Sequence, residues 1–194
     1  MKKKAIRLGE LVQIARGGSP RPIKSFITQE EDGVNWIKIG DTDQGGKYIF
    51  NTKQKIKRNG LKKSRYVKEG DFLLSNSMSF GRPYILKTSG CIHDGWLVLS
   101  NYEKFFDMNY LYYLLSSNTV QNQFEKIARG STVRNLNIDL VSNVLVTIPS
   151  IPEQKQIATK IDNSFAEINN SFYYSLEKEK QLEKLESKIL SSTF

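Results

Sequence analysis

Apolar residues recur every seven positions in the last fifth of the chain. This spacing is the period of a supercoiled helix pair. No proline or glycine follows Pro152, which can open a helix because its missing N–H costs nothing in the first turn. The pattern predicts one helix over residues 152–194, a rod of roughly 60 Å. The repeat consists of Ile161, Ile168, Ser175, Leu182 and Ile189.

A rod of this length needs a second helix to cover its apolar face. Folding back on its own domain is the alternative, but charges of alternating sign over residues 177–188 indicate a solvated outer face. We therefore expect a coiled coil, formed as an antiparallel homodimer. The expected dimer interface consists of Ile161, Phe165, Ile168, Phe172, Leu182, Leu185 and Ile189.

The preceding 151 residues combine short strand patterns with short helical ones. Residues 107–128 have helical apolar spacing, with a break expected near Ser116–Asn118. The fold class is therefore predicted as α+β: a mixed, mostly antiparallel sheet body with short helices, followed by a long protruding C-terminal α-helix. The expected units are the body over 1–151 and a dimerisation and spacer helix over 152–194. Strands are expected within 34–40, 69–75, 84–87, 96–99 and 144–148.

Composition limits the classes of protein that this chain can represent. The 194 residues carry a formal net charge of +9 with a pI near 9.5, which favours a polyanionic partner. A single cysteine allows no internal disulfide and suits a reducing cytoplasm. No apolar run is long enough to span a membrane, and Arg7, Glu10 and Gln13 interrupt any export signal. We expect a cytoplasmic protein.

The excess positive charge lies in one segment, residues 47–68, which has nine basic residues and no acidic one. Residues 152–194 carry seven acidic residues and six lysines, so the helix is close to neutral. Asn59–Gly60 is expected to form a turn within the basic segment. The residues expected to contact the DNA backbone are Lys53, Lys55, Lys57, Arg58, Lys62 and Lys63.

Two polar loops are candidates for reading DNA bases. Glycine and proline define a loop over residues 16–22, and a second polar loop covers residues 76–82. Asn and Arg side chains read adenine and guanine edges through paired hydrogen bonds. Ordinary solvent-facing turns are the alternative for both loops. The candidate residues are Arg16, Ser19, Arg21, Asn76, Ser77, Ser79 and Arg82.

The sequence offers no catalytic constellation. Cys91 and His93 cannot fill a zinc site, and no second histidine exists for a catalytic triad. A turn with an ordinary thiol and imidazole is the expected structure there. The Asn/Asp-Pro-Pro-Tyr/Phe motif of adenine methyltransferases is absent, as is a Pro-Asp and Glu-x-Lys nuclease pattern. We expect a protein without enzymatic activity, metal or cofactor.

Several motifs together resemble one known family. They are Gly130-Ser131-Thr132, Asn-Leu-Asn at 135–137, and Ile-Pro-x-x-Pro-Glu-Gln-Lys-x-Ile at 148–157 before a long helix. This arrangement resembles the specificity subunit of type I restriction–modification systems. Leu8-Gly-Glu-Leu, Arg16-Gly-Gly-Ser-Pro20 and Glu69-Gly-Asp-Phe-Leu-Leu-Ser75 resemble its target-recognition domain. Family members usually carry two recognition domains and two long helices, so this chain resembles a half-length form.

The resemblance implies a division of roles between the two units. The recognition domain would read one half of a bipartite double-stranded DNA target. The helix would dock the modification (methyltransferase) subunits and, through them, a restriction subunit. Two alternatives stay open: the recognition fragment of a single-chain restriction–methylation enzyme, and a non-catalytic interaction module that binds RNA or another acidic surface.

Overall fold

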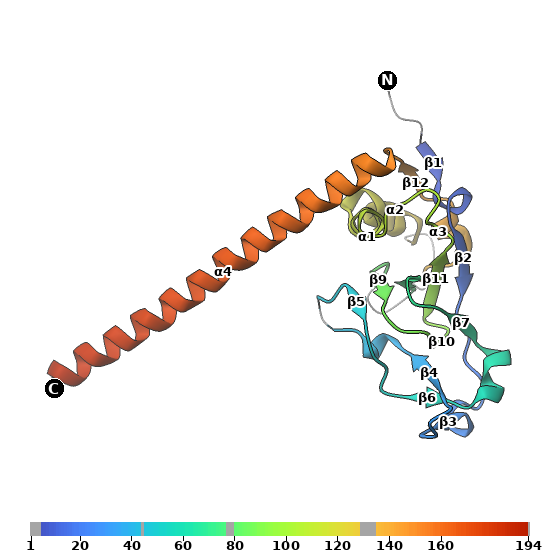
Figure 1. Cartoon of the computed structure of the whole chain (residues 1–194), viewed down its shortest axis with the longest axis horizontal. Coiled ribbons are helices and arrows are strands. Elements are labelled where there is room, and N and C mark those ends of the chain that lie inside the picture. Colours follow the sequence, from blue (N-terminus) through green and yellow to red (C-terminus); the bar gives the residue numbers. More distant parts are fainter. Residues whose placement is uncertain (1–4, 44, 77–79, 129–134, 194) are drawn as a thin grey trace. The chain divides into compact units, whose positions relative to one another are not determined.

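The computed structural model describes residues 5–43, 45–76, 80–128 and 135–193 (Figure 1). The chain divides into two compact units, Met1–Ile151 and Pro152–Phe194. We call them the body and the helical unit. Of the nine strand pairings among the described residues, seven are antiparallel and two are parallel. The predicted α+β class, with a mostly antiparallel body and a long C-terminal helix, is confirmed.

The first five-stranded sheet of the body has the order β2-β11-β8-β9-β5. Its three inner strands are almost completely buried, as continuous apolar runs predict. β11 pairs antiparallel with both β2 and β8, while β5 and β9 run parallel. The strands are β2 (Gln13–Arg16), β5 (Tyr48–Ile49), β8 (Phe72–Ser75), β9 (Pro83–Leu86) and β11 (Trp96–Ser100).

The second five-stranded sheet has the order β3-β6-β4-β10-β7. It consists of β3 (Ile27–Thr28), β4 (Val34–Ile37), β6 (Lys55–Ile56), β7 (Arg65–Val67) and β10 (Gly90–Ile92). Two further strands, β1 (Ala5–Arg7) and β12 (Leu145–Thr147), form a separate antiparallel pair. Both five-stranded sheets contribute to one hydrophobic cluster, in which Ile37 and Ile92 accompany Leu73 and Trp96. The body therefore has a core that both sheets share.

Short helices complete the body. α1 (Met108–Ser116) and α2 (Asn118–Ala128) are separated at Ser117, which confirms the predicted break. The Asp107 side chain caps α1 by accepting a hydrogen bond from the Tyr110 N–H at 3.1 Å. α1 packs on β9, and α2 packs on both α1 and α3 (Ile138–Ser142). These contacts cover one end of the first sheet.

Two local expectations were wrong. Asn59–Gly60 lies inside η4, a 3-10 helix over Arg58–Lys63, rather than in a hairpin turn. Gly60 is buried there, close to the Phe26 ring, so packing selects the tighter helix. Cys91 lies in the buried strand β10 rather than in a turn, because β10 pairs with β4 and β7 on either side. The other 3-10 helices are η1 (Leu8–Glu10), η2 (Ile23–Ser25) and η3 (Ile39–Asp41).

The helical unit is a single helix, α4, which runs from Ile151 to Thr193. Its apolar side chains remain largely exposed; Phe165 is 54% exposed, Phe172 66% and Leu182 60%. None of the helices in the described ranges combines the length and hydropathy needed to cross a bilayer. The predicted coiled-coil pairing remains a prediction.

A three-residue turn, 93–95, joins β10 of the second sheet to β11 of the first. Backbone N–H groups of Ile39 and Gly95 face Nε2 and Nδ1 of His93, at 3.2 and 2.7 Å, and the neutral ring accepts from one of them. A Cβ atom on Gly95 would lie 2.2 Å from the His93 ring, so this contact requires glycine. Two N–H donors face the ring, and an imidazolium has no acceptor nitrogen for either. Burial correspondingly lowers the pKa of His93 from its ordinary 6.5.

The His93 environment predicts a loss of stability under mild acid. Because the folded-state pKa is lowered, the stabilisation is fully present above pH 6.5 and declines as pH falls towards the folded-state pKa. The free energy of unfolding, measured by urea denaturation, should therefore fall more between about pH 7.5 and 5.5 than it does in His93→Gln. His93 is the sole histidine, so its NMR titration is unambiguous. A titration midpoint at or above 6.5 would contradict this account.

Candidate nucleic-acid interface

Loop 17–22 is held against the 93–95 turn by two glycines. The N–H of Gly17 donates to the Trp96 carbonyl at 2.9 Å, and the N–H of Gly18 donates to the Ile92 carbonyl at 3.1 Å. A Cβ atom on Gly17 would lie 2.0 Å from the His93 carbonyl oxygen, so no larger residue fits. The Arg16–Pro22 region is therefore fixed at its start by the same turn that joins the two sheets.

Asp94, in the middle of that turn, contacts side chains from two loops. Its carboxylate accepts a hydrogen bond from the Ser19 hydroxyl at 2.6 Å and lies 3.5 Å from the Arg21 guanidinium. Its backbone carbonyl accepts from Arg16 Nε at 3.2 Å and from Asn76 Nδ2 at 2.8 Å. We call these five residues the Asp94 cluster. It brings together members of the two groups that the sequence placed in separate loops.

The electrostatics of the cluster favour an ionised Asp94. The Ser19 hydrogen bond lowers the pKa of the carboxyl, with smaller contributions from His93 and Arg21, against the opposing effect of burial. Side-chain exposure is 48% for Asp94 and 76% for Arg21, so both charged groups reach solvent. The cluster can therefore present an anion and a cation to a ligand at the same place.

The structure gives Asn76 a supporting position. The residue is 2% exposed, and its side-chain amide points to the Asp94 carbonyl rather than to solvent. Its backbone N–H donates to the Gly95 carbonyl at 3.0 Å, and its carbonyl accepts from Leu136 at 2.9 Å. Asn76 thus braces the turn. Ser77 and Ser79, the neighbouring candidates, lie outside the described residues.

Arg82 lies in a different environment from the cluster. Its guanidinium carbon is 5.4 Å from the centre of the Tyr84 ring, within cation–π range. The side chain is half-buried and lines a pocket together with Pro83, Tyr112, Ser116 and Gln121. The Arg82 guanidinium therefore lies where β9 meets α1 and α2, although its backbone pairs with Ser75, the residue before Asn76.

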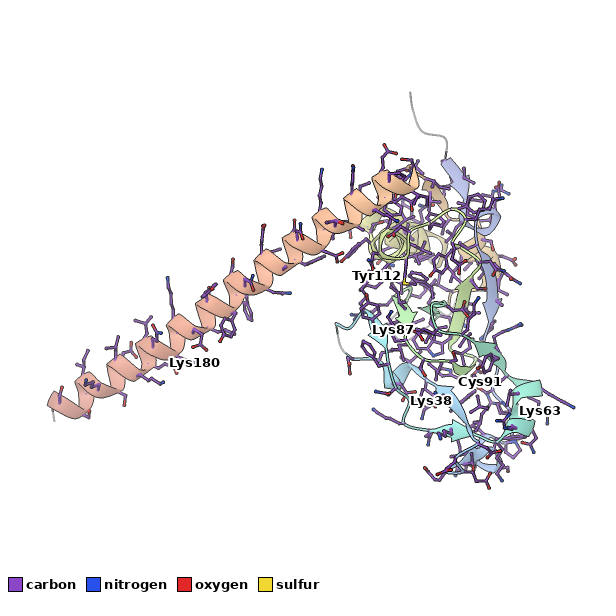
Figure 2. The ribbon with its side chains drawn as sticks, in the orientation of Figure 1. Lys38, Lys63, Lys87, Cys91, Tyr112 and Lys180 are labelled. Atoms are coloured by element: carbon purple, nitrogen blue, oxygen red, sulfur yellow. The ribbon has the colours of Figure 1, made fainter. Side chains whose placement is uncertain are left out.

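The basic segment does not form one uniform surface. Lys55 and Arg58 line a groove with Tyr66, and Arg58 lies 3.5 Å from Asp32. Lys63 has its ammonium 5.5 Å from the centre of the Phe26 ring; in Figure 2 it lies at the periphery of the body. Lys57 and Lys62 are exposed, and neither pairs with an acidic side chain in the part of the chain that is described.

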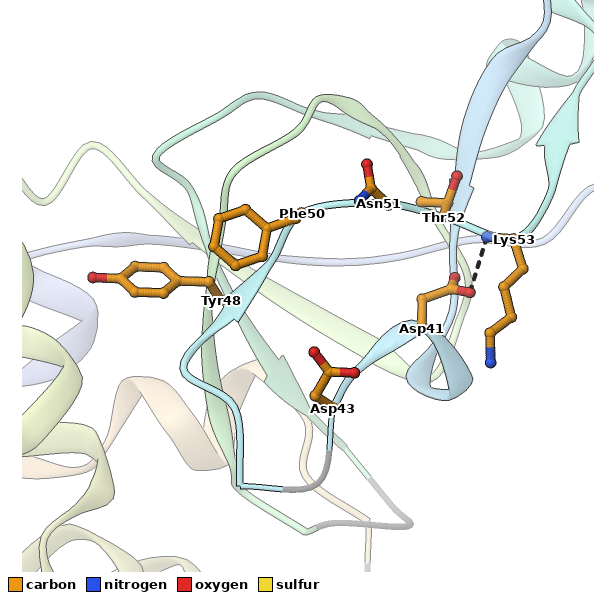
Figure 3. Close-up of a pocket in the computed structure, with 7 residues that line it drawn as sticks. All are labelled: Asp41, Asp43, Tyr48, Phe50, Asn51, Thr52 and Lys53. Atoms are coloured by element: carbon orange, nitrogen blue, oxygen red, sulfur yellow. Dashed lines mark hydrogen bonds between the residues drawn. The ribbon is translucent and has the colours of Figure 1, made fainter. Parts of the chain in front are cut away.

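Lys53 lies apart from these groups, beside two aspartates (Figure 3). Its backbone N–H donates to Asp41 at 3.2 Å and its ammonium to the Gly40 carbonyl at 2.9 Å. The pocket there also contains Asp43, Tyr48 and Phe50. The carboxylates reduce the positive charge that Lys53 can offer to a phosphate.

Part of the basic segment is continuous with the Asp94 cluster. Arg65 donates from Nε to the Arg16 carbonyl at 3.4 Å, and Ser64 donates to the Ile92 carbonyl at 3.1 Å. A Cβ atom on Gly18 would lie 3.2 Å from the Lys63 carbonyl, so the loop and η4 are adjacent. Arg65 was not selected from the sequence, because only this long-range contact distinguishes it from other exposed cations.

Lys47 was also not selected from the sequence as a site residue, and its contacts lie within the body. Its ammonium lies 4.8 Å from the ring centres of both Tyr112 and Tyr113, and 5.6 Å from that of Tyr48. It also donates to the Asn109 side chain at 2.9 Å. Lys47 therefore ties the region of β5 to α1, and its charge is engaged within the body.

Comparison with known proteins agrees with this architecture. Residues 2–188 match the model of the family described as type I restriction modification DNA specificity domain. The chain is 24% identical over 163 residues to the StySPI specificity subunit of Salmonella potsdam, covering 77% of this chain and 35% of that protein. It is also 24% identical over 197 residues to the MjaVIII specificity subunit of Methanocaldococcus jannaschii, with 96% and 44% covered.

A solved structure concerning assembly and conformational transition of the type I R-M system has the same fold. The TM-score is 0.73 at 22% sequence identity, over 97% of this chain and 44% of that one. The chain thus spans less than half the length of the relatives that it matches. Because the family match extends over both the body and most of α4, the chain belongs to the type I restriction modification DNA specificity domain family.

Proposed function

We propose that this chain is a DNA-binding specificity subunit that reads one half of a bipartite target for a type I restriction–modification system. The match to the specificity-domain family over residues 2–188 is the observation that carries this proposal. The net charge of +9 suits a polyanionic ligand. In this role the chain performs no chemistry itself; it positions modification subunits, which carry out methyl transfer, on a chosen sequence.

The basic surface supplies contacts to the DNA backbone. Lys57 and Lys62 are the most available cations of the segment, since both are exposed and unopposed by acidic groups among the described residues. Lys55 and Arg58 follow along the groove beside Tyr66. Lys63 adds a charge next to loop 17–22. Lys53 contributes least, because Asp41 and Asp43 lie beside it.

Base discrimination in this proposal comes from Arg16, Ser19 and Arg21, with Arg82 as a second reading group. The Asp94 cluster gives the first group fixed positions, which base readout requires because hydrogen bonds to base edges are directional. Asn76 supports the turn beneath that group instead of touching a base. Ser77 and Ser79 remain candidates for contacts from the second loop.

The helical unit provides assembly. Ile161, Phe165, Ile168 and Phe172 form the apolar stripe in the first half of α4, and Leu182, Leu185 and Ile189 continue it in the second. Antiparallel pairing of two identical chains buries both halves and satisfies two-fold symmetry. Because α4 follows the body in each chain, the two recognition domains would lie near opposite ends of a helix pair of roughly 60 Å. The target would then be an inverted repeat with an unread spacer.

Neutralising two backbone-contacting lysines should weaken the salt dependence of binding. Each phosphate contact contributes roughly −0.9 to the slope of log K against log salt on duplex DNA. Lys57→Gln with Lys62→Gln should therefore reduce the steepness by about two, without changing the preferred sequence. Fluorescence anisotropy on a duplex at several salt concentrations measures this slope. Lys178→Gln with Lys184→Gln on α4 removes the same charge and should leave it unchanged.

An unchanged slope in the Lys57 and Lys62 double variant would reject this surface as the backbone-contacting face. A slope reduced equally by the α4 double variant would show that total charge, and not this surface, controls binding.

Arg82→Ala should affect discrimination at a single base position. Loss of a good bidentate contact costs about 1–3 kcal/mol there. Selection from a randomised duplex pool, performed with the wild type and the variant, measures the preference at every position. A uniform loss across all sequences would instead assign Arg82 to a phosphate.

Disrupting the α4 stripe should abolish self-association. Sedimentation at micromolar concentration should give about twice the 22.2 kDa chain mass for the wild type. Ile168→Glu with Leu182→Glu should give the chain mass, because burying a charge opposite an apolar helix face is unfavourable. Asn170→Glu with Ser187→Glu adds the same charge on the polar face and should leave the dimer intact. A monomeric wild type would exclude the homodimer.

A further inference from the structure

We propose that Asp94 is the positioning residue that gives loop 16–22 its sequence selectivity: its carboxylate fixes Ser19 and Arg21 for base contact and disfavours binding where only phosphates are offered. This inference rests on the proposed function, because it assigns the discrimination step of DNA binding to one side chain. It extends that function by distinguishing Asp94, which determines sequence selectivity, from Ser19 and Arg21, which contact the DNA.

The hydrogen bonds around Asp94 support a positioning role. The Ser19 hydroxyl donates to Oδ1 of the Asp94 carboxylate at 2.6 Å and accepts from the Asp94 backbone N–H at 3.4 Å. Arg21 lies against the other oxygen, Oδ2, at 3.5 Å. The two carboxylate oxygens therefore hold two loop residues in a fixed spacing. Among the described residues, no other hydrogen bond or ion pair restrains the 76% exposed guanidinium of Arg21.

The support beneath Asp94 is rigid enough to make that anchor effective. Its backbone carbonyl accepts from Arg16 and Asn76, and the latter is almost fully buried. The next residue, Gly95, is held by the His93 ring at 2.7 Å. The backbone that carries the carboxylate is therefore held by residues from β2 and from the end of β8.

The charge of Asp94 supports a selective role. The carboxylate is 48% exposed on a surface that also carries Arg16, Arg21 and Lys38. A surface built only to hold phosphates gains nothing from an anion, because like charges repel. On the target, the base contacts of the positioned Ser19 and Arg21 offset this repulsion. The Asp94 carboxylate therefore lowers the affinity for unrelated DNA more than the affinity for the target.

A matched control exists elsewhere in the body. Asp32 lies 3.5 Å from Arg58, the same separation as between Asp94 and Arg21. Its side chain is 66% exposed, and within the described residues it anchors no loop through a second side-chain contact. Asp32→Asn thus removes one negative charge from an arginine pair without removing an anchor.

The experiment compares binding of the full-length chain to two duplexes. One is enriched by the wild type from a randomised duplex pool; the other is an unselected duplex of equal length. Asp94→Asn should tighten binding to the unselected duplex and weaken binding to the enriched one, lowering the ratio of the two affinities about tenfold. Asp32→Asn should tighten both in parallel and leave the ratio unchanged.

Two further variants separate positioning from charge and from folding. Ser19→Ala keeps the Asp94 charge and should lower the ratio without tightening binding to the unselected duplex. Ser19→Thr retains the hydroxyl and should restore the wild-type ratio, which a general loss of stability would not do. Thermal unfolding of each variant identifies any that fail to fold. If Asp94→Asn does not fold, the affinity ratios of the two Ser19 variants test the proposal.

The outcomes distinguish this inference from the function on which it rests. A wild type that enriches no sequence from the pool would overturn the proposed function, and Asp94 selectivity with it. A wild type with clear preference, but equal ratios for Asp94→Asn and Asp32→Asn, would overturn only the role of Asp94. A Ser19→Ala ratio equal to that of the wild type would do the same.

Discussion

The close packing of the 93–95 turn is the constraint on which the body depends. This turn carries the chain from β10 in one sheet to β11 in the other, and both strands lie in the interior of their sheets. Gly17 and Gly95 allow backbone to approach within distances that no Cβ atom tolerates. The imidazole of His93 fills the remaining space between two backbone N–H groups, and in its neutral form it can accept a hydrogen bond from one of them. The geometry that joins the sheets is therefore also the geometry that places loop 17–22.

In the proposed function, recognition residues lie on a loop whose first residues are hydrogen-bonded to the ends of two interior strands. Loop residues tied to a rigid turn lose less conformational entropy on binding, so more of their contact energy contributes to affinity. The cations divide accordingly. Lys47 stabilises the body through the tyrosines of α1, whereas Lys57 and Lys62 reach solvent. The total positive charge of the sequence therefore exceeds the charge that a polyanion can contact.

Patterns within one element were predictable from sequence, and contacts between distant elements were not. The break at Ser117, the buried strand Phe72–Ser75 and the long α4 all follow from local periodicity and helix-breaking residues. Cys91 was assigned to a turn because its strand is only three residues long and pairs with β4 and β7 from distant parts of the chain. Asn76 looked like a reading residue because sequence shows its polarity but not its direction. Arg65 was distinguishable only through its contact with Arg16.

The exposed stripe on α4 has a consequence for how the protein would respond to its own abundance. A side chain such as Ile168 is 61% exposed in the single chain. If the α4 pairing proposed above forms, the amount of dimer rises with the square of the free-chain concentration at low occupancy, by mass action. Recognition of two half-sites would then be a second-order process. A modest fall in expression would remove two-site binding disproportionately, while each single body kept its full affinity for one half.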